Sequence, residues 1–369
     1  MKRRALIAAL AAGIVLASCG GSDSKPKSAP KSAKANGGTS AASPSVPATG
    51  PVFPLTGLSD SDGTGATRPV VTVKIPNNNV SPNLRTGAQQ GLDQADVVYE
   101  EVVDGEITRF LAMFHSKTPE RVGPVRSVRP MDPDVVWHVG GIFAYSGGAP
   151  NVVPLINAAP VNAVDESEAQ ASKALFRDRS VSRQTEFTLF ANIKTLLTLG
   201  GTPAPPPAAF QYRDEDVASQ GDPILAATIG FATNYGQPTW AWNETTKLFT
   251  RRYGSTPHVS GATPITAANI VVQFIRYDGG RGRTGAKGVV IGSGKAWILS
   301  DGKLVKGTWN RATREDPTSF VSDAGQPILL TPGQTWVELA DESYQVGVMP
   351  AAPPATGSSS TPTASTKKP

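Results

Sequence analysis

The sequence predicts an α/β or α+β N-terminal domain with a mixed sheet, followed by a β-rich C-terminal domain. Three observations support this fold class. Strand-like and helical patterns alternate from residue 70 to residue 200. Short β-branched and aromatic runs, separated by turn residues, fill residues 221–349. A proline-rich segment over residues 203–220 lies between the two patterns and predicts a stiff linker. We therefore expect domains at residues 52–202 and 221–349.

The N-terminus has the pattern of a lipoprotein signal peptide over residues 1–18. Basic Lys2-Arg3-Arg4 precedes an apolar stretch that is too short to span a bilayer. Leu16-Ala17-Ser18-Cys19 resembles the bacterial lipobox, which implies cleavage before Cys19 and attachment of a diacylglyceryl group to its sulfur. Cys19 is the only cysteine, so no intramolecular disulfide is expected. No later stretch is long and apolar enough for a membrane helix, so we expect an extracytoplasmic protein anchored to the cell membrane by its N-terminal lipid.

Two low-complexity segments flank the predicted body. Residues 19–51 are mostly Gly, Ser, Ala, Pro and Lys, which predicts a disordered tether that reaches on the order of 30 Å from the bilayer. Residues 350–369 have a similar composition and predict a disordered tail. The formal net charge is +5, but the signal peptide carries +3, the tether +3 and the tail +2, which leaves −3 on the body. A nucleic-acid surface needs basic charge clustered on the folded part, so we expect no nucleic-acid partner.

The first predicted strand covers residues 70–75, and a hairpin centred on Asp104-Gly105 follows. Asp-Gly between two β-rich runs is typical of a two-residue type I′ turn, because that turn needs positive φ at both central residues. Such a turn would place Val102 opposite Ile107 and Glu100 opposite Arg109. A charge pair in a sheet that is covered on both faces is either a structural ion pair or part of a binding site.

Residues 122–130 are predicted to be extended and to lead into a helix. Asp132 is the expected N-cap, and Gly140-Gly141 is expected to end the helix. Three residues that suit a phosphate or carboxylate group lie just before this helix: Arg126, Ser127 and Arg129. As an alternative, Asp132 and Asp134 themselves fill the positive end of the helix.

A strand over residues 142–145 then runs into a glycine turn. Ser146-Gly147-Gly148, with a short helix starting at Asn151, is a second candidate cradle for an anion, and a plain tight turn is the alternative. A further helix is predicted over residues 166–176. Another is predicted from an N-cap at Thr188, because the apolar residues that follow have helical spacing.

The C-terminal half is predicted to consist of short strands and turns. The candidate strands are residues 224–233, 239–243, 248–253, 270–277, 288–291, 296–300, 304–309, 327–330 and 335–339. Asp301-Gly302 predicts a second tight hairpin. The tryptophans of this half, at positions 240, 242, 297, 309 and 336, are expected in the core rather than on a sugar-stacking platform.

Three strings carry a resemblance to a known family: Ile107–Phe114, Val122–Pro130 and Ile142–Gly148. Together with weaker matches that run to Pro332–Trp336, they resemble the YerB-like lipoprotein family, domain of unknown function 3048. The resemblance implies a two-part extracytoplasmic lipoprotein without an assigned biochemical activity. The sequence departs from the family pattern after Arg183, because an expected His-Asn pair is missing there.

Most motifs of catalysis and metal binding are absent from the sequence. His115, His138 and His258 have no partner at metal-ligand spacing, so we expect no metal site and no cofactor. The Gly292–Ala296 string lacks the spacing and the Ser or Thr of a phosphate-binding P-loop. The body also lacks a cysteine nucleophile and a Gly-x-Ser-x-Gly elbow. The basic loop at residues 278–285 is expected to be solvated.

These observations favour a binding or assembly module for an anionic ligand of the cell envelope. Six residues are assigned to its site: Arg126, Ser127, Arg129, Ser146, Arg109 and Glu100. The first and third hold the anionic group, the two serines donate hydrogen bonds, and the Glu100–Arg109 pair braces the floor. One alternative is an enzyme that acts on a phosphorylated or glycan polymer of the envelope. The other is a scaffold that binds another envelope protein.

Overall fold

The computed structural model describes residues 50–77, 89–171, 173–181, 184–200, 204–214, 216–231 and 236–351. The predicted signal peptide, the lipidation site at Cys19, and nearly all of the predicted tether and tail lie outside these ranges. The fold below therefore concerns the body of the protein.

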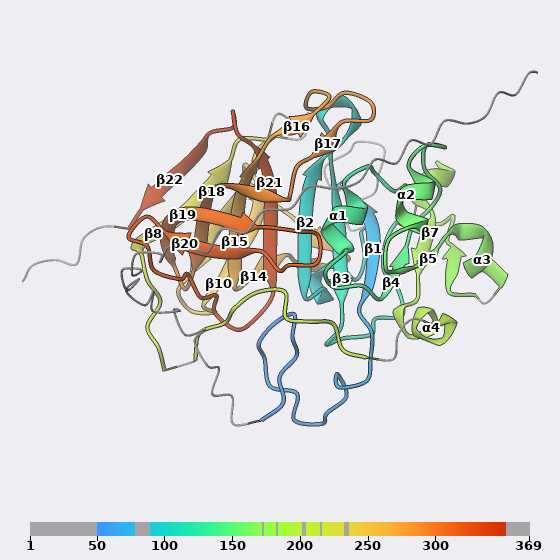
Figure 1. Ribbon diagram of the computed structural model, residues 1–369, viewed down its shortest axis with the longest axis horizontal. Coiled ribbons are helices and arrows are strands. Elements are labelled where there is room, and N and C mark those ends of the chain that lie inside the picture. Colours follow the sequence, from blue (N-terminus) through green and yellow to red (C-terminus); the bar gives the residue numbers. More distant parts are fainter. Residues whose placement is uncertain are drawn as a thin grey trace, which may run out of the picture. The chain divides into compact units, whose positions relative to one another are not determined.

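A mixed sheet runs through both halves of the body (Figure 1). Its N-terminal strands are β1 (Val71–Pro76), β2 (Val97–Val102), β3 (Thr108–Phe114), β4 (Ile142–Ala144) and β5 (Asn162–Val164). Its C-terminal strands are β8 (Asp222–Ile229), β9 (Pro238–Asn243), β10 (Leu248–Tyr253), β11 (Thr256–Pro257), β14 (Thr266–Ala267), β15 (Asn269–Ile275), β18 (Gly292–Ser300), β19 (Lys303–Arg311), β20 (Ser319–Ser322), β21 (Thr335–Asp341) and β22 (Val346–Pro350). Within the described residues, the strand order is β11-β10-β9-β8-β19-β18-β15-β21-β2-β3-β1-β4-β5. Three two-stranded sheets accompany it: β6 (Leu175–Arg177) with β7 (Leu189–Ala191), β12 (Val259–Ser260) with β13 (Thr263–Pro264), and β16 (Tyr277–Asp278) with β17 (Lys287–Gly288).

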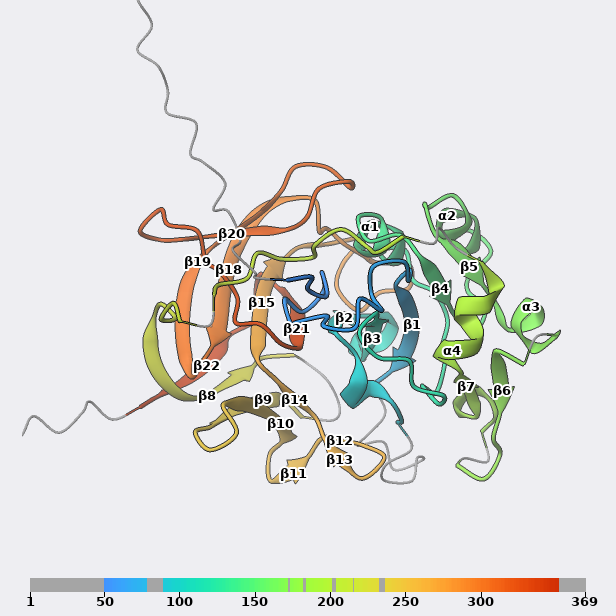
Figure 2. The same cartoon turned by 90° about the horizontal axis from the view of Figure 1, so that it is seen from below.

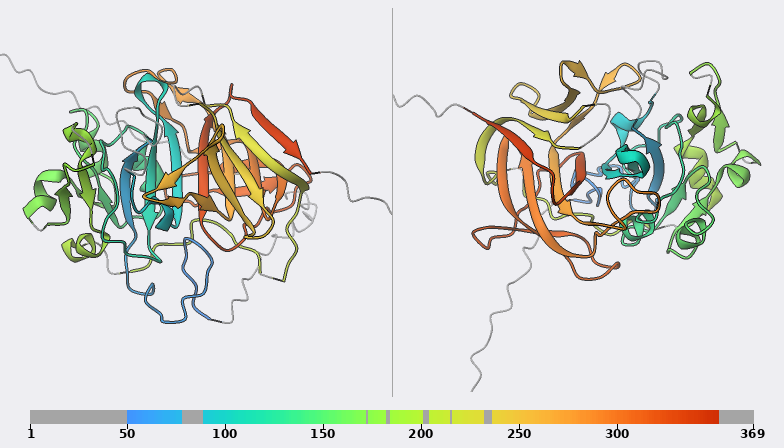
Figure 3. Two further views of the ribbon diagram at one scale, coloured as in Figure 1. Left: turned by 180° about the vertical axis from the view of Figure 1, so that it is seen from behind. Right: turned by 90° about the horizontal axis from the view of Figure 1, so that it is seen from above.

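Strand β21 joins the two halves of the sheet. It lies parallel to β15 on one side and parallel to β2 on the other, so Trp336 has Ile270 and Val98 as its two neighbours across the strands. Figure 3 shows the red β21 next to the cyan β2 and β3 from two further sides. All three of these residues are completely buried, so the apolar core continues from one half into the other.

The helices are short and belong to the N-terminal half. They are α1 (Asp132–Val136), α2 (Val153–Asn157), α3 (Glu166–Ala171) and α4 (Ile193–Leu196). In Figure 2, α1 lies over one face of β1–β3, while β9 and β10 lie on the opposite side. The sheet is therefore covered on both faces near β2, which explains why every residue of β3 is buried. The predicted fold class, a helix-bearing mixed-sheet half followed by a β-rich half, is confirmed.

The predicted register of the first hairpin is wrong by one residue. The strands pair Val102 with Thr108 and Glu101 with Arg109, so Glu100 lies on the other face of the sheet from Arg109. The loop has three residues rather than two, because Glu106 joins Gly105 in the left-handed region, with φ of 59° and 74°. A slip of one residue moves each side chain of a strand to the opposite face, so the predicted Glu100–Arg109 pair does not form.

Three predicted helices also differ from the structure. The helix that begins at Asp132 ends at Val136, before its predicted stop at Gly140-Gly141. The segment predicted as a helix over residues 166–176 is helical only to Ala171, and its last residues enter β6. Residues 189–191 form β7, so the following helix begins later and is capped by Asn192, whose side chain accepts a hydrogen bond from the Thr195 amide at 2.9 Å. The spacing of the apolar residues did not separate strand from helix here. Both β7 and α4 are too short to show the two-residue period of a strand or the 3.6-residue period of a helix.

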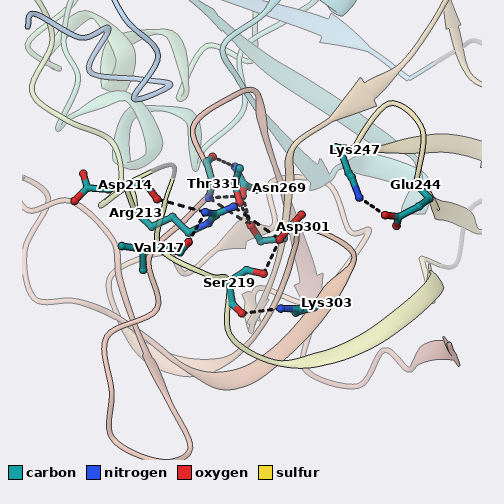
Figure 4. A network of polar contacts seen from close by, with 11 residues as sticks. Arg213, Asp214, Val217, Ser219, Glu244, Lys247, Asn269, Asp301, Lys303 and Thr331 are labelled. Atoms are coloured by element: carbon teal, nitrogen blue, oxygen red, sulfur yellow. Dashed lines mark hydrogen bonds and ion pairs between the residues drawn. The ribbon is translucent and has the colours of Figure 1, made fainter. Parts of the chain in front are cut away.

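The second predicted hairpin is confirmed. Ser300 pairs with Lys303, and the two turn residues, Asp301 and Gly302, have φ of 50° and 69°. The end of the proline-rich segment contacts this turn, as Figure 4 shows. The Ser219 hydroxyl donates to the Asp301 carboxylate at 2.8 Å, and the Lys303 ammonium donates to the Ser219 carbonyl at 2.9 Å.

We expect Gly302→Ala to lower the free energy of unfolding by about 2 kcal/mol, the sum of backbone strain and a clash. The added Cβ atom would lie 2.7 Å from the Trp242 ring, on a residue whose φ is +69°. Gly254→Ala is a matched control, because Gly254 has a φ of +55° and nothing within 4 Å of the added atom. Urea denaturation of both variants separates the two costs. Equal losses would show that the contact with Trp242 contributes nothing.

Candidate anion-binding site

The extended segment before α1 is held in place by its backbone. The Arg126 amide donates to the Lys74 carbonyl of β1 at 2.8 Å, and the Ser146 amide donates to the Arg126 carbonyl at 3.0 Å. The Val125 amide donates to the Leu189 carbonyl at 2.7 Å. The segment therefore lies among β1, β7 and the end of β4, and its backbone position does not depend on a ligand.

Three arginines gather along this segment. Arg109 of β3 is only 5% exposed and donates from Nη1 to the Ser127 carbonyl at 2.9 Å. Arg129 donates from Nη1 to the Val128 carbonyl at 3.0 Å. Arg126 donates from Nη1 to the Glu186 carbonyl at 3.3 Å, and its guanidinium carbon lies 4.9 Å from the centre of the Phe187 ring. The predicted site residues Arg126 and Arg129 thus lie beside Arg109. The predicted partner of Arg109, Glu100, lies on the other face of the sheet.

The Nε atoms of all three guanidinium groups are buried and have no hydrogen-bond partner among the described residues. Buried polar atoms in native proteins are normally hydrogen-bonded, so three unmet donors of one kind are unusual. A planar guanidinium presents Nε and Nη hydrogens in a fork that suits the two oxygens of a phosphate, sulfate or carboxylate group.

Few acids pair directly with the cluster. Glu101 and Asp132 lie near Arg109 and raise its pKa, but neither forms an ion pair with it in the described residues. Only Arg129 has an ion-pair partner, the Asp104 carboxylate at 2.8 Å, among the ion pairs formed within the described part of the chain. Burial, with the charges of Arg129 and Arg126, lowers the pKa of Arg109 to about 9. Burial also lowers the pKa of Arg126, which the Glu186 carboxylate partly offsets and the charge of Arg129 reinforces. An anion bound here would remove this repulsion.

A buried charge network lies beneath the arginines. Lys74 of β1 is completely buried and forms ion pairs with Glu101 of β2 and, at 2.9 Å, with Asp132 of α1. Glu101 lies directly opposite Arg109 in the β2–β3 ladder. Lys74 and Glu101 were missed from the sequence, although a lysine in the apolar run of residues 70–75 was a signal that it had a buried partner.

The other predicted contacts of the site are different in the structure. The Ser127 carbonyl contacts the arginines, and the Ser146 hydroxyl donates to Glu166 at 3.2 Å. Asp132 is the first residue of α1 rather than its predicted N-cap, and its carboxylate accepts from the Arg129 amide at 2.8 Å. Asp132 and Asp134 both lie in the first turn of the helix, so the arginine side chains, and not the helix end, carry the candidate site.

Glu100 belongs to a second network on the opposite face of the sheet. Its carboxylate forms an ion pair with Arg251 of β10 and lies across from Glu338 of β21. Arg251 Nε is 3.9 Å from the Glu338 carboxylate, and Trp240 Nε1 donates to the same carboxylate at 2.7 Å. Burial first, and the charge of Glu100 second, raise the pKa of Glu338 well above its usual value. This network is completely buried and stabilises the junction of the two halves.

Other predicted features lie away from the arginines. His115 directly follows β3, and its Nε2 lies 3.1 Å from the Gly65 carbonyl. The loop at residues 278–285, predicted to be solvated, contacts the first hairpin, because Arg281 forms an ion pair with Glu106 at 3.2 Å. A surface cleft of about 500 Å³ is lined by residues near 90–94, 118–121 and 260–263, and none of the predicted site residues lines it.

A mixed sheet shared by two halves, with an arginine cluster on one face, defines a two-part protein without a recognisable catalytic constellation in its described residues. The chain belongs to the family whose description is protein of unknown function DUF3048. The model of the N-terminal domain matches residues 55–202, and the model of the C-terminal domain matches residues 227–337. The resemblance read from the sequence is confirmed.

The sequence and the structure of the chain both resemble YerB of Bacillus subtilis. The protein named "Putative lipoprotein YerB" of strain 168 is 26% identical over 302 residues, which cover 78% of this chain and 86% of that protein. The crystal structure of the YerB protein matches with a TM-score of 0.64 at 19% identity, over 80% of this chain and 98% of that one. The second match shows a shared fold. Within the described residues, no helix is long and apolar enough to cross a membrane.

Proposed function

We propose that the protein is a lipid-anchored extracytoplasmic module that binds an anionic group of a cell-envelope ligand. The lipobox at residues 16–19 and the name of the relative support the anchored location. The predicted tether would keep the body on the order of 30 Å from the bilayer surface. The two halves of the body, divided as predicted at residues 203–220, would act as one binding unit.

One observation carries the binding proposal: three buried Nε donors without partners in the described residues, at Arg109, Arg126 and Arg129. The buried Nε of Arg251 also lacks a hydrogen-bond partner in the described residues, but Arg251 differs because two internal acids, Glu100 and Glu338, face its guanidinium group. Among the described residues, Asp104 is the one acid that forms an ion pair with these arginines, so an anionic ligand group would supply the missing hydrogen-bond acceptors.

We expect Arg126→Ala to weaken the binding of a phosphodiester polymer by about 10- to 100-fold, the effect of one lost charge-assisted hydrogen bond. The assay is isothermal titration calorimetry of the detergent-solubilised full chain with synthetic poly(glycerol phosphate). Arg126 is suited to this test, because its guanidinium has no ion pair among the described residues that its removal would break. Its loss should therefore affect binding more than folding.

Arg276→Ala is the control, because Arg276 is exposed and pairs only with the neighbouring Asp278 in the described structure. It should bind the polymer like the unchanged protein. If the unchanged protein shows no saturable binding, or if the two variants bind equally, the proposal is wrong. Turnover of the polymer during the titration would identify the protein as an enzyme instead.

A further inference from the structure

We propose that Glu101 is a proton-binding site coupled to the arginine cluster, so that the protein takes up a proton when an anion binds. This inference rests on the proposed function, because it concerns the same three arginines. It adds a property that the binding proposal does not contain: the affinity for a doubly charged anion falls as Glu101 ionises. The argument comes from the position of Glu101 between a buried cation and the arginines.

Glu101 is placed to sense charge at the cluster. The β2–β3 ladder puts its backbone directly opposite Arg109, so the two side chains project from the same face of neighbouring strands. Directly opposed residues in such a ladder have Cβ atoms about 4.5–5.5 Å apart. Glu101 has no exposed surface, and water therefore does not screen its interaction with an anion that Arg109 contacts.

The carboxylate of Glu101 is only half satisfied. Its Oε1 atom pairs with the Lys74 ammonium, whereas its Oε2 atom is buried and has no hydrogen-bond partner among the described residues. An ionised carboxylate with one unmet oxygen is costly in the interior, and a protonated carboxyl group is less so. The contacts therefore favour a proton on this group.

The charged and titratable groups around Glu101 come from several elements. Lys74 lies on β1, Asp132 on α1 and Arg109 on β3, with Arg126 and Arg129 beyond it. The Tyr277 hydroxyl of β16 lies nearby, where it accepts from the Val102 amide at 3.0 Å and donates to the Leu339 carbonyl at 2.7 Å. Two acids, one lysine and one arginine thus meet across three strands and a helix.

The pKa of Glu101 agrees with this geometry. Burial is the largest cause that raises it, the Asp132 carboxylate raises it further, and Lys74 lowers it, with a result of about 8. Glu101 is therefore mostly protonated at pH 7 and mostly ionised at pH 9. An anion bound to Arg109 would repel the ionised form, so binding raises the pKa again and a proton is taken up.

The test uses sulfate, because its charge stays constant between pH 6.5 and 8.5 and any dependence on pH then belongs to the protein. For a rise of about one pKa unit on binding, linkage gives a fall in affinity of about threefold over this range. Titration calorimetry in two buffers with different ionisation enthalpies should also show uptake of about 0.4 proton per sulfate at pH 8. Glu101→Gln, which mimics the protonated acid, should lose most of this proton uptake, and its affinity should fall by less than about 1.5-fold; that remaining change comes from Arg109, whose pKa is about 9.

Glu106→Gln is the matched control, because Glu106 lies in the same hairpin but pairs with Arg281. This variant should keep the pH dependence of the unchanged protein. Saturable binding that does not vary with pH, or a threefold fall in affinity that persists in Glu101→Gln, overturns the coupling while the binding proposal stands. Absence of saturable sulfate binding at every pH overturns both. Thermal unfolding of Glu101→Gln confirms that the variant is folded.

Discussion

Replacement of Arg251 by glutamine should lower the free energy of unfolding by about 3–5 kcal/mol, the usual result of removing one partner from a buried ion pair. Arg251 is completely buried, and it is the cation that faces both Glu100 and Glu338 in the described residues. The two carboxylates lie opposite each other on β2 and β21, so without the arginine their repulsion is unopposed.

Urea denaturation at pH 7 measures this loss. Arg252→Gln is a matched control, because Arg252 is the next residue on the same strand and its side chain is exposed. It should change the free energy of unfolding by less than about 0.5 kcal/mol. The double variant Arg251→Gln, Glu100→Gln should recover part of the loss, since one of the two acids is then neutral. A loss below about 1 kcal/mol for Arg251→Gln would show that the network does not stabilise the junction.

Replacement of Lys74 by methionine should cost a similar amount, about 3–4 kcal/mol at pH 7. Methionine fills a comparable volume, but the Asp132 carboxylate is then left buried without its cation, and Glu101 loses its hydrogen bond from Lys74. Lys117→Met is the control, because Lys117 is exposed in the loop after β3. If both lysine variants unfold at the same urea concentration as the unchanged protein, the ion pairs of Lys74 contribute nothing to stability.

The pH dependence of this loss has a definite sign. The pKa of Glu101 is about 8 in the folded protein and 4.5 in the unfolded chain, so folding takes up a proton. The stability from this proton is fully present below pH 4.5 and is lost as the pH rises through 8. Lys74 lowers the pKa of Glu101, so this pKa is higher in Lys74→Met, and the pH range in which the stability from the proton is lost moves upward. Lys74→Met should therefore be more destabilising at pH 9 than at pH 6.

The sequence predicted the fold class and most C-terminal strands because their signals are local. Period-two alternation and the Asp301-Gly302 turn depend on neighbouring residues only. The Asp104-Gly105 hairpin was predicted at the right place with the wrong register, because a two-residue and a three-residue loop both accept Asp-Gly. The two loops differ in whether Glu106 adopts a left-handed backbone conformation, as it does here. The side chain of Glu106 accepts a hydrogen bond from Arg281, which lies 175 residues away in the sequence.

The candidate site was predicted in part for a related reason. Arg126 and Arg129 could be placed beside a helix start from their local string. Their neighbours Arg109 and Lys74 come from β3 and β1, and the ladder of those strands decides which side chains meet. The partners of Glu100, which are Arg251 and Glu338, lie more than 150 residues further on, so no local pattern could reveal them.

The place of β21 in the sheet has a consequence for how the protein is made. The edge of β2 that receives β21 is synthesised 238 residues before its partner, so a chain made from its N-terminus carries an open hydrogen-bonding edge until residues 335–341 are synthesised. Because β21 is synthesised near the end of the body, the central sheet can be completed only when almost the whole body has been synthesised. A product that stops before residue 335 would present two unpaired strand edges, at β2 and β15, and would be a substrate for chaperones and proteases rather than a half-active protein.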